Sequence, residues 1–308
     1  MTQAKTKVLF VGALTYDTVF RVDDFSQGPG KYMAGESTIS ASGMAANAAT
    51  AAARLGGDVA LWASVGGDAM AGALIAEIED EGVDCAHVRH VPDGRSASAT
   101  IVVDATGERW VIVDYDKVTQ GVPTEQEKPP IEHYAAVMAD VRWPGAAMVA
   151  LRTARAAGRH AILDADTAPL SVLENLAPCA SHIVASTQGA SILTGSDEPF
   201  DAAHKIANRY GCFVCVTNGA GGSFWTESQS SEVHHIHAPS VEAVDTNGAG
   251  DVFHGAFSQA LAEGKTPKEA IQFASSAAAL KCTVFGGCLG APLRQATLKM
   301  MNATYHDL

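Results

Sequence analysis

Hydrophobic residues follow two alternating patterns along the chain. Short apolar runs such as KVLFVGAL (7–14) and DVALWASVG (58–66) have the composition of buried strands, and Ala-rich segments such as MAANAATAAARLG (44–56) have helical spacing. Further apolar runs follow in the order AAVMADV, HAILDAD, SHIVAS and FVCVTNG, with helical segments between them. This βαβα order predicts a doubly wound α/β fold, in which a mostly parallel sheet is flanked by helices.

Glycines mark the expected ends of several helices. Gly56, Gly82, Gly158 and Gly211 each follow a helical segment and precede a strand or turn. Glycine is favoured just after a helix because it adopts the left-handed conformation without strain from a Cβ atom. These positions therefore support the same alternation of helices and strands.

Two segments interrupt this alternation, at about residues 16–40 and 96–115. The second, SASATIVVDATGERWVIVDY, alternates around an Ala-Thr-Gly-Glu turn, which is typical of a β-hairpin. We expect these segments to form a small β-sheet lid beside the main sheet, within one domain of residues 1–308. Such a lid would shield a reaction from water, and its exposed apolar edges would favour a homodimer.

The composition argues against several classes of protein. With 308 residues, 47% of them hydrophobic, the chain can bury a large core. Its formal net charge of -13, from 21 Lys and Arg against 34 Asp and Glu, argues against a nucleic-acid partner. No apolar run is long enough to span a membrane, no signal-peptide pattern opens the chain, and the six cysteines lack the spacing of a disulfide framework. We therefore expect a cytoplasmic protein with no membrane partner.

The segment VEAVDTNGAGDVFHGAFSQALAEG (241–264) carries the clearest chemical signal. We expect an apolar strand to end at Val244, a glycine-rich loop to follow, and a helix to begin near Ala249. Ligands of open α/β sheets usually bind where a strand ends and a helix begins. The free N–H groups of Ala249, Gly250 and Asp251, together with the helix dipole, can then hold phosphate oxygens.

Two aspartates of this segment have the chemistry that phosphoryl transfer needs. Asp251 can accept the proton of an attacking hydroxyl, and Asp245 can position a metal-bound water or support the loop. Gly248 and Gly250 let the backbone approach a ligand closely. In the alternative interpretation the aspartates cap the helix and the glycines form a turn, and the motif by itself does not decide between the two.

The stretch from Asp245 to Ala256 resembles the C-terminal signature D-T-x-G-A-G-D-x-F-x-G-A of the ribokinase-like, or PfkB, family of carbohydrate kinases. Asn247 stands where threonine is common. The resemblance covers essentially the whole chain, and the family also has a β-lid. It implies an enzyme that transfers phosphate from ATP to a sugar hydroxyl with Mg2+, and a monovalent cation such as K+ is compatible with it.

The resemblance also implies positions for both substrates. VGALTYD places Asp17 at the sugar-hydroxyl-binding aspartate of the family, and SGMAANAATAAARLG places Gly43 and Asn47 on its substrate segment. VTNGAGG and SSAAALKCTVFGG match nucleotide-binding segments, which would otherwise be interpreted as an ordinary turn and a plain helix. The residues expected to bind ATP are Thr217, Gly219, Gly222, Asn247, Gly248, Gly250, Ser275, Ala278 and Gly286.

One departure from the family concerns the metal. The family usually carries N-x-x-E before L-T-G, whereas STQGASILTG places Ser186 and Gly189 at those two positions. MgATP is still expected, because the charge between phosphates must be neutralised whichever side chain holds the water shell of the metal. Asp245 is the residue that we assign, indirectly, to this metal.

Within the family, the chain is most similar to the sulfofructose kinases, which phosphorylate 6-deoxy-6-sulfofructose at its 1-hydroxyl. The shared stretches are GKYMA, ADVRW, DVFHGAF and ALKCT. In that group a Lys, an Arg and an Asn bind the sulfonate; Lys31 and Arg142 match, but Asp114 stands where the Asn would be. Cys288 stands where those kinases carry an Arg.

The sequence therefore leaves the identity of the substrate open. A sulfonate is a permanent anion that Lys31 and Arg142 suit, but the Asp114 carboxylate would repel it unless a cation lies between them. Arg142 pairing with Asp140 or Asp114 would also weaken the anion site. The alternative substrates are an uncharged ketohexose, a pentose, an amino sugar or a nucleoside. A further alternative is a catalytically inactive protein on this fold that senses sugar or nucleotide.

Overall fold

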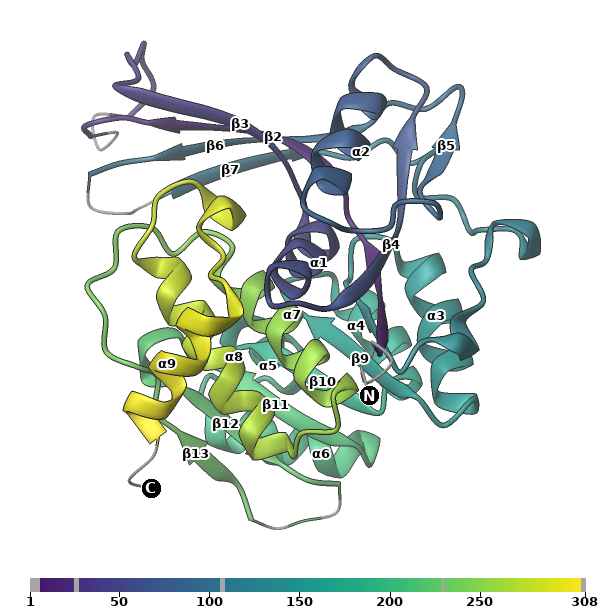
Figure 1. Cartoon of the computed structure of the whole chain (residues 1–308), viewed down its shortest axis with the longest axis vertical. Helices are drawn as coiled ribbons and strands as arrows, with labels where there is room; N and C mark the ends of the chain where they lie inside the picture. The colour runs from purple at the N-terminus through teal and green to yellow at the C-terminus, as the bar shows by residue number, and fades with distance from the viewer. Residues whose placement is uncertain (1–5, 25–27, 106–108, 229, 231, 306–308) are drawn as a thin grey trace.

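The structure is a computed structural model that describes residues 6–24, 28–105, 109–228, 230 and 232–305. Its strands form a nine-stranded sheet and a separate four-stranded sheet (Figure 1). The large sheet has the order β13-β12-β11-β10-β9-β8-β1-β4-β5. Its strands are β1 (Lys7–Gly12), β4 (Asp58–Gly66), β5 (Arg89–Val91), β8 (Ala136–Ala139), β9 (His160–Ala165), β10 (His182–Ser186), β11 (Phe213–Thr217), β12 (Ser223–Thr226) and β13 (His234–Ile236).

The pairing confirms the mostly parallel sheet that the sequence predicts. Every pairing from β5 across to β11 is parallel, and only the β11–β12 and β12–β13 pairs are antiparallel. The strand order changes direction at β1, because β4 lies on one side of it and β8 on the other. The carboxyl ends of β1 and its neighbours therefore form the edge where a ligand is expected.

Helices cover both faces of the large sheet (Figure 1). On one face lie α1 (Met44–Arg54), α2 (Met70–Asp80), α7 (Ala249–Ala262), α8 (Pro267–Cys282) and α9 (Arg294–Tyr305). On the other lie α3 (Pro144–Ala156), α4 (Leu170–Leu176), α5 (Thr187–Thr194) and α6 (Pro199–Tyr210). Short 3-10 turns, at Glu125–Glu127, Ile131–His133, Ala177–Cys179, Gly219–Gly221 and Gly287–Gly290, connect several of these elements.

Strand β1 shows why its sequence forms a buried central strand. Val8 and Phe10 belong to the core beneath α1 and α7, whereas Leu9 and Val11 belong to the core on the other face. Successive side chains of a strand point to opposite faces, so a continuous apolar run is what a sheet covered on both sides requires. This arrangement confirms the doubly wound interpretation.

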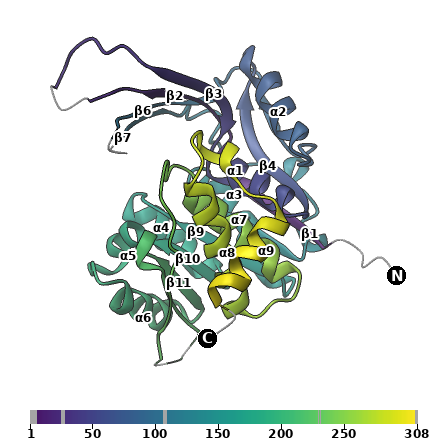
Figure 2. The ribbon, with the colours of Figure 1, turned by 60° about the vertical axis from the view of Figure 1, so that its left-hand side comes forward.

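The four-stranded sheet is the predicted lid. It consists of β2 (Thr15–Arg21), β3 (Glu36–Ser42), β6 (Ala97–Val103) and β7 (Arg109–Asp114), in the order β3-β2-β6-β7. Figures 1 and 2 show it projecting from the main body, on the side toward which β1 leads. β6 and β7 pair antiparallel, as a hairpin would, but most of the Ala-Thr-Gly-Glu turn lies outside the described residues.

The predicted helix ends are confirmed, and one predicted strand is wrong. All four glycines expected to follow helices have positive φ angles, between 62° and 89°. The residues leading to Val244, however, form no strand, and the Val244 side chain is about half exposed. The N–H groups of Val244 and Asp245 donate instead to the carbonyl of Cys282 at the end of α8, so this segment is fixed by a helix end rather than by a sheet.

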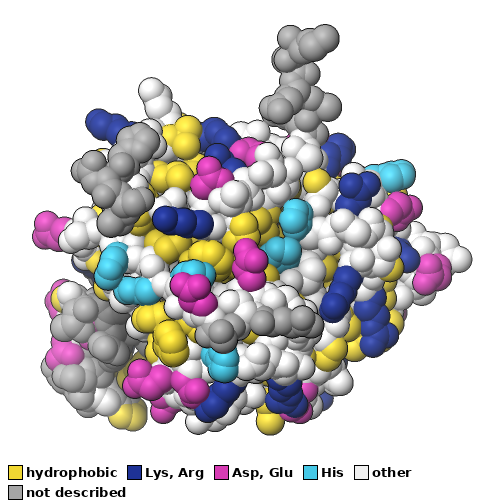
Figure 3. Space-filling view, turned by 90° about the horizontal axis from the view of Figure 1, so that it is seen from below, with side chains coloured by type: hydrophobic (Ala, Val, Ile, Leu, Met, Phe, Trp, Pro, Cys, Tyr) yellow, Lys and Arg dark blue, Asp and Glu magenta, His cyan; other side chains and the backbone are white. Residues whose placement is uncertain are grey.

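The described residues contain no helix of the length and apolarity needed to cross a membrane. On the face shown in Figure 3, basic, acidic and histidine side chains are interspersed with hydrophobic ones. The described residues on that face therefore form no continuous basic surface of the kind that follows a nucleic-acid backbone.

Helices α1 and α7 cross at a point where only glycine fits. A Cβ atom added to Gly255 would lie 2.2 Å from the carbonyl oxygen of Ala48. The two helices carry the first residues of the candidate site, so this close crossing holds their N-termini together.

We expect Gly255→Ala to lower the free energy of unfolding by about 1–3 kcal/mol, because the added methyl group overpacks the crossing. Gly72→Ala in α2 is the matched control: nothing lies within 4 Å of its added Cβ, and alanine should raise stability by about 0.5–1 kcal/mol. Urea unfolding of both variants measures the difference. Equal stability of Gly255→Ala and the unmodified protein would show that the crossing is not tight.

Candidate active site

The site is centred on Asp251, in the first turn of α7. Its Oδ2 accepts a hydrogen bond of 2.7 Å from the amide Nδ2 of Asn47, in the first turn of α1. Asn47 Nδ2 also donates to the Ser42 hydroxyl at 3.2 Å, at the end of lid strand β3. The predicted residues Asn47 and Asp251 are therefore brought together at the junction of the lid and the main sheet.

Burial raises the pKa of Asp251 from its ordinary 3.8 to about 7. The Asn47 hydrogen bond lowers this pKa, and the nearby carboxylate of Asp164 raises it, but loss of solvent is the largest effect. A carboxyl group with a pKa near neutrality can exchange a proton with a bound hydroxyl, which is what general base catalysis requires.

The start of α7 leaves backbone donors available beside this carboxylate. Gly248 caps the helix in the left-handed conformation, with φ 75°. Among the described residues, the N–H groups of Gly250 and Asp251 have no hydrogen-bond acceptor, and a Cβ added to Gly250 would meet nothing within 4 Å. The N–H of Ala249 donates to the carbonyl of Thr246 at 3.3 Å, so two of the three predicted phosphate donors are free in this conformation.

Asp245 fixes the loop that leads to these donors. Its carboxylate accepts hydrogen bonds from the N–H groups of Asn247 (2.8 Å), Gly286 (3.1 Å) and Gly287 (3.0 Å). The ammonium of Lys281 lies 3.1 Å from Oδ2 of the same carboxylate. These contacts hold the pKa of Asp245 below its ordinary value. Supporting the loop is thus the role that its contacts show, while a metal role stays a prediction.

Asp17 lies at the start of the lid, as the resemblance implies. It is buried, and its Oδ1 accepts a hydrogen bond of 2.7 Å from the Thr15 hydroxyl. Burial raises its pKa, although hydrogen bonds from Thr15 and Ser42 oppose this effect. Gly43 has φ 106°, and a Cβ there would lie 2.6 Å from the carbonyl oxygen of Ala13, so only glycine allows α1 to begin so close to β1.

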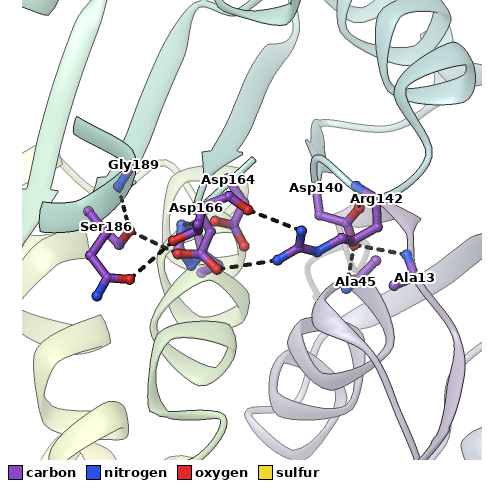
Figure 4. Close-up of polar contacts among 11 residues, drawn as sticks. Ala13, Ala45, Asp140, Arg142, Asp164, Asp166, Ser186 and Gly189 are labelled. Carbon is purple, nitrogen blue, oxygen red and sulfur yellow. Dashed lines mark hydrogen bonds and ion pairs between the residues drawn. The ribbon is translucent and has the colours of Figure 1, made fainter. Parts of the chain in front are cut away.

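Asp140, which the sequence suggested only as a partner of Arg142, holds several segments of the site together (Figure 4). It is fully buried and accepts hydrogen bonds from the N–H groups of Ala13 (2.8 Å), Ala45 (3.0 Å) and Arg142 (2.7 Å). It thereby fixes the end of β1, the start of α1 and the loop after β8 around one carboxylate. The sequence signal for Asp140 is only that an acidic residue follows a predicted strand.

The guanidinium of Arg142 points toward the acidic end of β9 (Figure 4). Its guanidinium donates to the carbonyl of Thr167 at 3.0 Å and lies 3.7 Å from the Asp166 carboxylate. It forms no side-chain pair with Asp114, which lies 3.1 Å from Arg95 instead. Pairing of Arg142 with Asp114 is therefore wrong for this structure, and its contact with Asp140 is made by the backbone.

A pocket lies beside Arg142 and contains a residue that the sequence analysis did not single out, Tyr115. Burial raises the pKa of the Tyr115 hydroxyl. The negative charge of Asp140 raises this pKa further, and the positive charge of Arg142 lowers it. Lys31 and Asp114 do not line this pocket, and both are exposed on the lid. The pocket is lined by Gly12, Ala13, Leu14, Ser64, Ala97, Tyr115, Thr119, Gln120, Arg142 and Trp143.

Two further carboxylates lie where β9 ends, and both were missed by motif reasoning. Asp164 is fully buried, neither of its oxygens has a hydrogen-bond partner among the described residues, and burial raises its pKa well above the ordinary value. Its Oδ1 lies 3.3 Å from Nε2 of His254 in α7. Asp166 accepts a hydrogen bond of 2.8 Å from the Ser186 hydroxyl. The signal for both was the acidic end of the run HAILDAD.

Ser186 and Gly189 explain why the family acid is absent. The Ser186 hydroxyl caps α5 by accepting from the N–H of Gly189 at 3.0 Å (Figure 4). A Cβ added to Gly189 would lie only 1.9 Å from the carbonyl oxygen of Ala165. No side chain therefore fits at position 189, and Asp166 is the acid that lies beside the start of this helix.

The carboxylates of the site fit a Mg2+ ion that is held mainly by the phosphates of the nucleotide and by water. It prefers oxygen ligands and is usually held by one or two carboxylates together with substrate phosphates and water. The part of the chain that the structure describes contains no group of three or more metal-ligating side chains. Asp164 and Asp166 supply carboxylate oxygens close enough to Asp251 for their charges to raise its pKa.

The predicted nucleotide-binding residues occupy three neighbouring segments. Thr217 ends β11, and the exposed Gly219 follows in the turn before Gly222. Close packing also requires glycine at position 222, because a Cβ there would lie 2.2 Å from the carbonyl oxygen of Ile236. Ser275 is buried in α8, while Ala278 of the same helix is partly exposed. Contact with ATP stays a prediction for all of these residues.

Comparison with known proteins identifies the family. The pfkB family of carbohydrate kinases matches residues 5–294, nearly the whole chain. The ribokinase of Haemophilus influenzae is 30% identical over 301 residues, which is 94% of this chain and 97% of that protein. The chain therefore belongs to the pfkB family of carbohydrate kinases, enzymes that use ATP to phosphorylate sugars.

Solved structures agree with this assignment. A protein from Agrobacterium tumefaciens, provisionally named a ribokinase, is 42% identical and superposes with a TM-score of 0.93 over 97% of this chain and 98% of that one. The Arabidopsis thaliana ribokinase, solved with ribose and ATP, has a TM-score of 0.82 at 23% identity, over 97% of this chain and 99% of that one. Both confirm the ribokinase-like fold with its separate lid sheet.

Proposed function

We propose that this chain transfers the terminal phosphoryl group of ATP to a sugar hydroxyl, with Asp251 as the general base. The observation that carries the proposal is the combination at the start of α7 of a carboxyl with a pKa of about 7 and free backbone N–H groups. The carboxylate accepts the proton of the attacking hydroxyl, and the donors of Gly250 and Asp251 stabilise the charge of the transferring phosphate.

Asp251 must be ionised to accept a proton, so kcat/KM should fall as the pH decreases below about 7 and level off above it. Asp251→Asn should lose activity by about 10²–10⁴-fold at every pH, since general base catalysis contributes that much. ADP release coupled to a spectrophotometric assay measures the rates, and calorimetry checks that Asp251→Asn still binds nucleotide. Unchanged turnover in this variant would remove Asp251 from the mechanism.

The same pKa predicts that the substitution does not weaken the fold at neutral pH. A carboxyl whose folded pKa exceeds its unfolded value stabilises the protein below the unfolded value of 3.8, and this contribution is lost as the pH rises through about 7. Asparagine avoids burying that charge. We therefore expect Asp251→Asn to be at least as stable as the unmodified protein at pH 7, which separates lost catalysis from lost folding.

We also propose that Asp166 takes the role of the acid missing at position 189 and holds the water shell of Mg2+ bound to ATP. The metal would neutralise charge between the phosphates. Support comes from the Ser186 hydroxyl, which joins Asp166 to the start of α5, and from the blocked space at Gly189.

Asp166→Asn should therefore raise the Mg2+ concentration needed for half-maximal activity by about 10–100-fold, the usual cost of losing an outer-shell partner of a metal. Asp201→Asn, on the exposed Asp201–Lys205 pair of α6, is the matched control and should leave the Mg2+ dependence unchanged. A Mg2+ titration of the rate with sugar and ATP saturating measures both. The same curve for Asp166→Asn and the unmodified protein would contradict the role.

For the sugar, we propose 6-deoxy-6-sulfofructose, phosphorylated at its 1-hydroxyl. Four stretches shared with sulfofructose kinases support this choice, together with Arg142 on the pocket wall. The pairing of Asp114 with Arg95 places a cation beside the carboxylate that would otherwise repel the sulfonate. Ribose is the second candidate, because the Haemophilus influenzae relative and the Arabidopsis structure are ribokinases.

A panel of 6-deoxy-6-sulfofructose, fructose, fructose 6-phosphate, ribose and fructosamine should give sulfofructose a kcat/KM at least about tenfold above the rest, or ~1.4 kcal/mol in transition-state binding. Arg142→Gln should lower kcat/KM for sulfofructose by about tenfold or more, the value of a hydrogen bond to a charged group, and leave ribose little changed. Ribose ahead of sulfofructose would overturn the choice of sugar. ADP release with none of them would favour a sensing protein instead.

We propose a homodimer formed through the lid, supported by its outer strand β7, whose residues are all exposed and include Val111, Ile112 and Val113. An edge strand with apolar side chains is a surface that another chain can cover. A cytoplasmic location is supported by the six cysteines, all of which are free thiols.

A further inference from the structure

Lys281, in the last turn of α8, is a charged side chain with no contact to solvent. Its exposed fraction is 0%, and it ranks among the largest fully buried side chains of the described residues. Its Nζ donates to the main-chain carbonyl of Asp245 at 2.7 Å and lies 3.1 Å from the Asp245 carboxylate. Burying an ammonium is costly, and a buried ion pair is weak evidence for stability, so its position calls for another explanation.

The oxygens that Lys281 contacts are the kind that a bare monovalent cation takes. A carboxylate oxygen and a carbonyl oxygen of one residue form a hard, negatively polarised donor set. Oδ2 of the same carboxylate also accepts the N–H groups of Gly286 and Gly287, and Oδ1 accepts that of Asn247, so Lys281 supplies the cation among its contacts in the described residues. A free K+ therefore does not fit at Asp245 in this chain, because Lys281 already fills the place where it would bind.

The position of this ammonium connects it to the reaction. Asp245 begins the loop that ends in the helix cap Gly248 and the free donors of Gly250 and Asp251. A cation bound to both the backbone and the side chain of Asp245 fixes where that loop starts. It also places a positive charge behind a segment that must receive phosphate, which compensates for the acidic surroundings of Asp251.

We propose that Lys281 is a built-in monovalent cation: its ammonium takes the place of a soluble K+ behind the phosphate-binding loop and makes the enzyme independent of monovalent cations. Lys281 is a positioning residue, since it acts through Asp245 and the loop. The inference rests on the proposed kinase function for its activity readout, but its nucleotide-binding readout requires no sugar.

The first test uses the unmodified protein. Activity and ADP affinity are measured in tetramethylammonium chloride and then with K+, NH4+ or Na+ replacing it at a constant ionic strength of about 0.1 M, so that screening is equal. We expect changes below about twofold in both quantities, whereas activation by K+ of about tenfold, equivalent to ~1.4 kcal/mol, would overturn the proposal. This measurement decides the question even if a Lys281 variant does not fold.

The second test creates the cation site. Lys281→Ala removes the ammonium and leaves space beside the Asp245 oxygens, so we expect about a hundredfold loss of activity and weaker ADP binding. K+ or NH4+ should restore both by about tenfold or more, and the small, strongly hydrated Li+ should not. Lys281→Met has a similar length without charge, fills the space, and should be inactive with every cation. Lys268→Ala, on the first turn of the same helix, is the surface control.

The outcomes distinguish a built-in cation from a structural ion pair, and they test the kinase function separately. A folded Lys281→Ala that keeps full activity, or one whose activity and ADP binding no cation restores, would show that Lys281 is only a structural ion pair. Rescue of ADP binding by K+ without sugar phosphorylation by the unmodified protein would support the built-in cation and reject the kinase. Circular dichroism and thermal unfolding verify that each variant is folded.

Discussion

The hydrogen bond between the Asn47 amide and the Asp251 carboxylate is the contact on which the arrangement of the site depends. It joins residues 204 positions apart in the chain and sets the first turn of α1 against the first turn of α7. The close crossing at Gly255 and the buried carboxylate of Asp140 hold the two helices in the positions that allow it. The starts of α1 and α7 and the end of lid strand β3 consequently meet beside the Asp251 carboxyl group.

Positively charged and N–H donor groups offset the negative charge of this site. The protein is acidic as a whole, and the carboxyl groups described in and around the site belong to Asp17, Asp140, Asp164, Asp166, Asp245 and Asp251. Burial raises the pKa of Asp164 and Asp251, neighbouring carboxylates raise it further, and an incoming polyphosphate would add to the repulsion. The free amides of α7, the guanidinium of Arg142 and the ammonium of Lys281 are the positive counterparts that the described residues provide. These local groups, rather than the net charge of the molecule, are the ones available to an anionic ligand.

Much of the fold and the centre of the site could be predicted from the sequence, because both depend on local patterns. Period-two and helical spacing revealed the strands and helices, and the GAGD segment placed Asp251 at the start of α7. Local pattern failed at Val244, where an apolar run is tied to the end of α8 instead of joining a sheet. Lys281 was also invisible, since its burial is decided by the loop from another part of the chain that packs over α8.

The partners of charged side chains were the least predictable feature. Arg142 was predicted to bind the sulfonate, with Asp140 or Asp114 as alternative partners, yet its guanidinium lies beside Asp166, which is 24 positions further along the chain. Asp114 pairs with Arg95, its near neighbour across the lid. Long flexible side chains reach several possible partners, and the three-dimensional placement of β9 and the lid decides between them.

The contact at Gly189 limits which residues this backbone can carry at that position. Because the Ala165 carbonyl occupies the space that any β-carbon at 189 would need, glutamate cannot be placed there without a shift of the β9 backbone. The acid at the end of β9 and the hydroxyl that joins it to α5 are free of this obstacle. Building an N-x-x-E segment into this chain would therefore require several coordinated replacements.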